Sequence, residues 1–128
     1  MLQFNSLQTK ELKNFIHKSN IHDAKVKDIR YDRQNKRLVI ETINLTQNTG
    51  FKFTFVEPRL ILSISGNWQG SYETILSLTV EEDSSYLENN VLIYDNKLNE
   101  SLYLLFQMFS GDELHIVSAE VLIDNIGD

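Results

Sequence analysis

Residues 101–124 read SLYLLFQMFSGDELHIVSAEVLID and form two apolar segments around a polar turn. The first nine residues are an almost continuous apolar run, which is typical of a strand covered on both faces. Residues 110–113 include a glycine among polar side chains and predict a hairpin turn. Residues 114–124 alternate with a period of two, so successive side chains take opposite faces. The stretch predicts an antiparallel hairpin whose first strand lies inside a sheet.

Upstream, the same period of two recurs in short segments separated by polar turns. Ile29 and Tyr31 change parity within their segment, which indicates either a bulge near residues 27–28 or a strand that buries both faces unevenly. Pro58 either ends a strand or marks a sheet edge. A turn is expected at residues 47–50, where Gly50 can take a positive φ. Including the two segments above, about eight strands are expected, over residues 22–32, 37–45, 51–57, 60–66, 71–83, 86–95, 101–109 and 114–124.

Residues 6–18 predict the one helix, capped by Ser6 or Thr9. Leu7 can extend the apolar stripe of the helix, which consists of Leu12, Phe15 and Ile16. The strands do not alternate with helices, so the sheet should be antiparallel. The predicted fold is therefore mainly β, with one N-terminal helix and either an antiparallel β-sandwich or a partly open barrel. Both architectures stay open at this point.

The length of 128 residues suits a single domain over residues 1–128. The absence of cysteine excludes disulfides, thiolate metal sites and cysteine nucleophiles, and it fits a reducing compartment. No apolar run has the length of a signal-peptide core or a membrane span. We therefore expect a cytoplasmic protein without a membrane partner.

The net charge of −6 is distributed unevenly along the chain. Residues 1–37 hold nine Lys or Arg against four acids, whereas residues 38–128 hold three against fourteen. The acidic excess argues against broad nucleic-acid binding, which depends on neutralising phosphates. Either the two parts pack together and neutralise each other, or an acidic surface steers a basic protein partner.

The dipeptide His22-Asp23 lies where the helix leads into the first predicted strand. An imidazole beside a carboxylate is a candidate base or metal ligand. Adjacent strand residues point to opposite faces, so the pair is not expected to act as one catalytic unit. We therefore interpret His22 and Asp23 as a structural junction between helix and sheet.

Four residues are candidates for contact with a partner: Trp68, Glu81, Glu82 and Asp83. Trp68 lies between two glycines, in a loop where it forms a contact hot spot or folds back to seal the core. The acidic run 81–83 lacks the alternating ligands and turn glycine of a calcium loop, so its alternative is an ordinary solvated loop.

No segment indicates a catalytic or cofactor site. His17, His22 and His115 are the only histidines, and they lack the short spacing of zinc ligands. Serine-hydrolase and phosphate-loop motifs are absent. We therefore expect no metal, no cofactor and no enzymatic activity.

Two patterns at the ends of the chain carry a resemblance. They are His22-Asp23-Ala24-x-Val26-x-x-Ile29-x-Tyr31-Asp32 followed by Leu38-x-Ile40, and Phe109-x-Gly111-x-x-Leu114-x-Ile116-x-x-Ala119. In these patterns the chain resembles a group of small bacterial β-proteins, which includes uncharacterised Firmicutes proteins and predicted immunity proteins of polymorphic toxin systems. The resemblance implies a non-enzymatic role such as toxin neutralisation, and it carries no catalytic residues.

Three functions remain open from the sequence. The first is a non-enzymatic interaction module with a basic protein partner, such as an immunity protein with an acidic surface. The second is a small-ligand binder with an apolar cavity inside a curved sheet. The third is an enzyme with a polar constellation around His22, Asp23 or His115. A structural or oligomeric role through exposed sheet edges is a further alternative, and the oligomeric state is left open.

Overall fold

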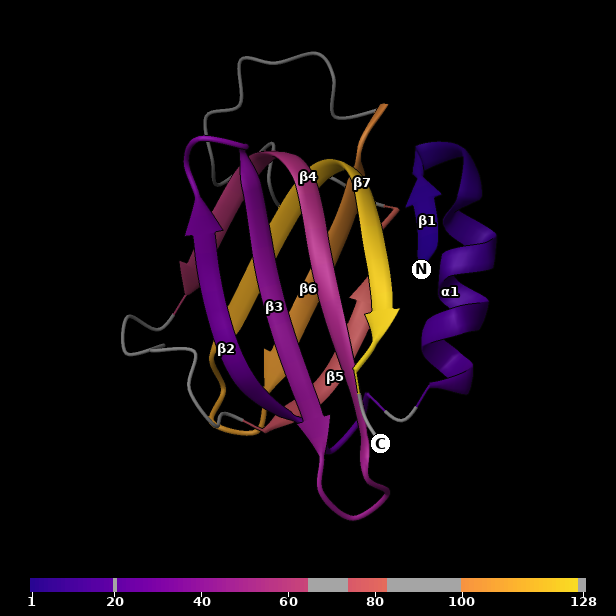
Figure 1. The fold of residues 1–128 in the computed structure, drawn as a ribbon, viewed down its shortest axis with the longest axis vertical. Helices are drawn as coiled ribbons and strands as arrows, with labels where there is room; N and C mark the ends of the chain where they lie inside the picture. Colours follow the sequence, from indigo (N-terminus) through magenta and orange to yellow (C-terminus); the bar gives the residue numbers. More distant parts are fainter. Residues whose placement is uncertain (20, 65–73, 83–99, 127–128) are drawn as a thin grey trace.

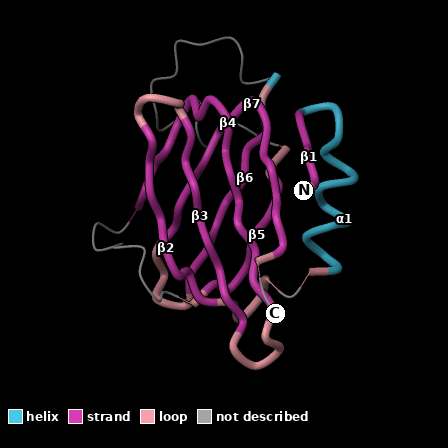
Figure 2. Tube along the Cα trace, viewed as in Figure 1, coloured by secondary structure: helices cyan, strands magenta, loops and turns pink. Residues whose placement is uncertain are grey.

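The computed structural model describes residues 1–19, 21–64, 74–82 and 100–126. These residues form a mainly β structure with one N-terminal helix (Figures 1 and 2). In chain order the elements are β1 (Leu2–Asn5), the 3-10 turn η1 (Ser6–Gln8), α1 (Thr9–Lys18), β2 (Lys25–Asp32), β3 (Arg37–Asn44), β4 (Thr49–Ile64), β5 (Ile75–Val80), β6 (Leu102–Met108) and β7 (Glu113–Asn125).

The described strands form one antiparallel sheet in the order β2-β3-β4-β7-β6-β5, and β1 also pairs with β7. β7 is long enough to pair with two strands along the same edge. Its first half pairs with β6 and its second half with β1, while β4 pairs with it along its length. The predicted hairpin of residues 101–124 is confirmed, and β6 lies inside the sheet as expected.

β4 and β7 bend sharply and carry the sheet from the front of the view to the back (Figure 1). At the bend Pro58 pairs with Ser118 and Leu60 with Val117, so Arg59 is an extra residue on β4. Ile116 and Val121 of β7 lie on either side of the bend, and both belong to the main core although their parity differs. The strict alternation predicted for residues 114–124 is therefore wrong.

The two ends of the sheet meet at one corner. Lys25 at the start of β2 forms an isolated bridge with Thr74, next to β5. The amide of Asp23 donates to Ile75 O at 2.9 Å, and the amide of Ile75 donates to Ala24 O at 2.8 Å. From this corner β2 and β5 diverge in Figure 1, so the sheet is not closed.

An aromatic cluster fills the space between the front and back of the sheet. The ring of Phe106 on β6 meets those of Phe53 and Phe55 on β4 edge-on, at 6.0 and 6.5 Å between centroids. Leu12 and Ile16 of α1 join this core from the side, where the helix packs against β1 and β5. The helix therefore covers the region between β1 and β5 that the sheet leaves open.

The N-terminal helix begins differently from the prediction. Residues 6–8 form η1, whose cap is Asn5: its side chain accepts from the amide of Leu7 at 2.9 Å. α1 itself begins at Thr9 and has no side-chain cap. The stripe of Leu12, Phe15 and Ile16 faces the core as predicted, but Leu7 is 89% exposed and does not extend it.

Several local predictions are confirmed and others are corrected. The register of β2 shifts between Val26 and Asp28, at the predicted bulge. The turn between β3 and β4 lies at residues 45–48, where Asn48 rather than Gly50 has a positive φ. The predicted strands 51–57 and 60–66 belong to one strand, β4, which is described up to Ile64. Its pairing with β3 ends at Val56, so among the described strands Pro58 has only β7 as a neighbour, as at a sheet edge. The predicted strand 86–95 lies outside the described residues, so the count of about eight stays a prediction.

Candidate functional site

His22 and Asp23 form a tight turn at the corner where β2 meets β5. Asp23 has a φ of +69°, and this unusual backbone turns the His22 ring toward the Asp23 carboxylate, with Nε2 3.4 Å from Oδ1. The other ring nitrogen, Nδ1, hydrogen-bonds the carbonyl oxygen of Leu76. The two side chains therefore face each other, contrary to the expectation from strand geometry, because these residues lie in a turn.

The hollow beside this turn is polar and small. It has a volume of about 260 Å³ and is lined by Ser19, His22, Asp23, Asn44, Thr46 and Gln47. Asn44 uses its side-chain oxygen to accept the amides of Thr46 and Gln47, at 3.1 and 3.2 Å. The amide of Asp23 is held by β5, as described above. These contacts support the interpretation of His22-Asp23 as a junction that holds β2 against β5.

The three histidines lie on separate elements. His17 is on α1, His22 in the turn before β2 and His115 on β7. In the described part of the chain, no three His, Asp or Glu side chains come together as a metal site would require.

His115 belongs to a polar network that joins β5, β6 and β7. The ring is 3% exposed, with Nδ1 2.6 Å from the Tyr103 hydroxyl and Nε2 3.3 Å from a carboxylate oxygen of Glu113. Gln107 donates to the other carboxylate oxygen at 3.3 Å and accepts from Ser77 at 3.0 Å. The sequence signal for this network was the alternation of Glu113 and His115, which places both on one face. Its burial suits a structural tie between strands rather than a substrate site.

The outer face of β2, β3 and β4 carries a second hollow, of about 290 Å³. Three cations, Arg30, Arg37 and Lys52, line it together with Tyr31, Asp32, Val39 and Thr54. Arg30 is already bound by carboxylates: the hydrogen bonds that it donates to Asp28 and then to Glu41 raise its pKa. Asp32 accepts the side chain and amide of Asn35. The charge of Arg30 is therefore offset by carboxylates on the same face.

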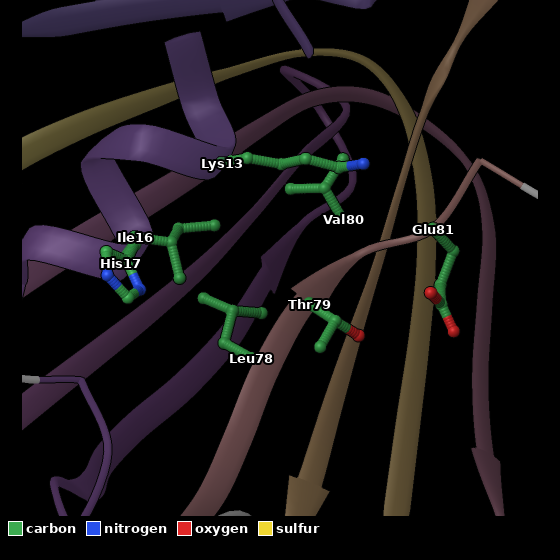
Figure 3. A pocket seen from close by; sticks show the side chains of 7 residues that line it. All are labelled: Lys13, Ile16, His17, Leu78, Thr79, Val80 and Glu81. Atoms are coloured by element: carbon green, nitrogen blue, oxygen red, sulfur yellow. The ribbon is translucent and has the colours of Figure 1, made fainter. Parts of the chain in front are cut away.

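A third hollow, of about 360 Å³, lies between α1 and β5 (Figure 3). Lys13, Ile16 and His17 line it from the helix, and residues 78–81 line it from the strand. At its rim, Lys13 Nζ lies 3.0 Å from Glu82 Oε1. Of the predicted partner-binding residues, Glu81 lines this hollow, and Glu82 pairs with one of its lining residues, Lys13. Trp68 and Asp83 lie outside the described residues.

The acidic residues at the end of β5 have a neighbour on β6. The amide of Glu81 donates to Tyr103 O at 2.8 Å, which sets the end of β5 level with the start of β6. Glu100, which is exposed, comes just before β6. We call Glu81, Glu82 and Glu100 the acidic end. The sequence indicated its first two members as a charge run at a strand end, but Glu100 joins them only through the pairing of β5 with β6.

Comparison of the chain with protein-family models, with curated proteins and with solved structures finds no match. No helix among the residues that the structure describes is both long and apolar enough to cross a bilayer.

Proposed function

We propose that the chain is a non-enzymatic interaction module that binds a basic protein partner through the acidic end. The observation that carries this proposal is the bond from the Glu81 amide to Tyr103 O, since it brings Glu81 and Glu82 to the same end of the sheet as Glu100. Like charges gathered at one end create a field that raises the association rate of an oppositely charged partner.

The local charge balance supports this use. Lys13 neutralises part of the charge of Glu82, but the Glu82 side chain is still 68% exposed. Glu100 is exposed as well. The resemblance to predicted immunity proteins adds a more specific version of this proposal, in which the basic partner is a toxin that the chain neutralises.

Small-ligand binding inside the sheet receives less support. The space between the front and back of the sheet holds Phe53, Phe55 and Phe106, all of them buried. The three hollows described above lie at an edge, on an outer face and beside a turn, rather than in this core. None of these three hollows is the interior apolar cavity that the second candidate function requires.

We also propose a partly open barrel as the architecture of the single domain, rather than a sandwich. The bridge between Lys25 and Thr74 supports it, because it joins the two ends of one continuous sheet. The lack of cysteine is in keeping with a cytoplasmic site of action.

The test is direct binding to the protein products of the genes adjacent to the one that encodes this chain. We expect one of them to bind, with an association rate that falls as salt is raised. Glu100→Lys should lower that rate by about tenfold at low salt, since a charge at the interface acts mainly on encounter. Surface plasmon resonance at two salt concentrations measures both effects.

Glu11→Lys is the matched control, because Glu11 is an exposed acid on α1 and the substitution changes the net charge by the same amount. We expect it to change the rate much less than Glu100→Lys. Equal effects of the two substitutions, or no binding to any neighbouring product, would contradict the proposal.

A further inference from the structure

β5 has one backbone edge that points away from β6. In an antiparallel pair, alternate residues direct their N–H and C=O groups toward the partner strand. Because the Glu81 amide donates to Tyr103 O, the backbone N–H and C=O groups of Glu81 and Thr79 point toward β6. Leu78 and Val80 therefore direct their backbone groups to the other side. Among the described residues, no backbone group is bonded to them there.

This edge faces the hollow of about 360 Å³ between β5 and α1. Leu78 and Val80 both line the hollow, and the opposite wall is formed by Lys13, Ile16 and His17 (Figure 3). The hollow thus runs beside a row of two amide donors and two carbonyl acceptors. An extended peptide that pairs with a sheet edge requires such a row, with space alongside it.

The edge of β2 carries features that oppose such pairing, whereas the edge of β5 has α1 beside it, with the hollow between the two. β2 carries Lys25 and Lys27 and a bulge after Val26, which are features that prevent edge-to-edge association. β5, with the sequence ILSLTV, has no charged side chain, and its irregularity lies at its start, between Ile75 and Ser77. The part of β5 beside the hollow is therefore a regular, uncharged edge.

We propose that β5 receives an extended segment of a protein partner, which adds as a strand to the outward groups of Leu78 and Val80. The segment carries a basic residue, because Glu81 lines the hollow at the end of this edge and Glu82 adjoins it. Lys13 offsets only one of these two carboxylates. This inference rests on the proposed function, since it gives the acidic end a partner and a mode of binding.

A capped seven-residue peptide of alternating valine and threonine, with lysine at both ends, serves as the probe. The readout is amide hydrogen exchange, followed by NMR on the full chain. We expect saturating peptide to slow exchange at Leu78 and Val80 by about tenfold or more, because a paired amide exchanges only on opening. A peptide with glutamate at both ends should bind more weakly, and one with a central proline should not protect these amides.

Two variants test the edge itself. Val80→Pro removes one outward donor without removing a bond to β6, and circular dichroism shows whether it folds. Thr79→Lys leaves the backbone intact, since Thr79 is exposed, and places a charge of the protective kind on the edge. We expect Thr79→Lys to lower the affinity for the peptide with terminal lysines by about tenfold. Thr79→Ser is the matched control and should bind as the unmodified chain does.

Three results would overturn the inference. The first is no protection at Leu78 and Val80 with saturating peptide, or equal protection along β2. The second is slow exchange of both amides in the monomeric chain without peptide, which would mean that the chain covers its own edge. The third is a dimer with protected β5 amides, which would make the occupant a second copy. If Glu100→Lys still lowers partner binding in any of these cases, the proposed function stands and only the strand addition is wrong.

Discussion

The ring of Phe53 lies at the centre of the aromatic core, 1% exposed and 6.0 Å from the ring of Phe106. Phe53→Ala should lower the free energy of unfolding by about 3–5 kcal/mol, because it removes buried surface and leaves a cavity between packed elements. Urea denaturation measures this loss. Leu7→Ala is the control: the side chain is exposed, so the change should stay within about 0.5 kcal/mol. Similar losses for both variants would show that Phe53 is not packed as described.

Asp32 makes a pH-dependent contribution at the turn between β2 and β3. Its pKa is lowered from 3.8, first by the Asn35 side chain and then by the Asn35 amide, both of which donate to the carboxylate. A lowered pKa means that the ionised form is favoured by folding. Its stabilising effect is therefore present above the unfolded pKa, and it is lost as the pH falls through the folded pKa.

We expect Asp32→Ala to be less stable than the parent chain at neutral pH and to converge with it in acid. Thermal denaturation from pH 7 to pH 2 measures the difference between the two curves. Asn35→Ala removes the side-chain donor but keeps the backbone amide. The stability difference between Asn35→Ala and the double variant Asp32→Ala/Asn35→Ala should therefore depend less on pH than the difference between the parent chain and Asp32→Ala. A difference that stays constant down to pH 2 would rule out this role for Asp32.

At the scale of elements, the sequence predicted the segments that have their own periodicity. The hairpins β2–β3 and β6–β7 were found, and so was the bulge in β2, because Ile29 and Tyr31 changed parity. β1 was missed because the alternation of its four residues, LQFN, is too short to predict a strand; they form one beside β7. The continuity of β4 was missed because proline ordinarily interrupts a strand, whereas here Pro58 lies past the last residue of β4 that pairs with β3.

The same reasoning applies to the candidate site. Glu81 and Glu82 were recognised as a charge run, since that property is local. The ion pair of Glu82 with Lys13 was not predictable, because it depends on α1 packing beside β5. The position of Glu100 at the same end of the sheet was not predictable either, because it depends on the pairing of β5 with β6. The side chains of His22 and Asp23 face each other in a turn where Asp23 has a positive φ, and the two residue types alone do not predict that backbone conformation.

Gly111 sets the geometry of the β6–β7 hairpin. Its φ is +96°, and a Cβ at this position would have no heavy atom within 4 Å among those described. Gly111→Ala should therefore cost about 1 kcal/mol through backbone strain alone, without a clash. Chemical denaturation measures it. Lys36→Gly is the matched comparison: Lys36 has a φ of +51°, so glycine should be neutral or slightly stabilising there. A loss at position 36 as large as that at Gly111 would refute the explanation by φ.

For the whole molecule, the uneven charge of the chain has a partial structural explanation. Among the described residues, Lys13 pairs with Glu82, Arg30 with Glu41 and the N-terminal amine of Met1 with Asp124, so the basic residues 1–37 contact the acidic remainder. Exposed ion pairs of this kind contribute little to stability. Packing rather than charge therefore holds the N-terminal segment to the sheet.

The N-terminal segment should accordingly be indispensable for folding. Phe4, Leu12 and Ile16 bury their side chains in the main core, and burial of each is worth roughly 1.5–3 kcal/mol. Together these contributions approach the whole stability of a typical domain, about 5–15 kcal/mol. A chain that lacks residues 1–19 should therefore lose its cooperative thermal transition and bind a hydrophobic dye.

Point variants on α1 separate packing from charge in the intact chain. Leu12 is 0% exposed, so Leu12→Ala should cost about 2–5 kcal/mol. Lys13→Ala, one residue further on, removes only the exposed pair with Glu82 and should cost less than about 1 kcal/mol. If the truncated chain still unfolded cooperatively at a similar temperature, or if Lys13→Ala cost as much as Leu12→Ala, the helix would not close the core in the manner described.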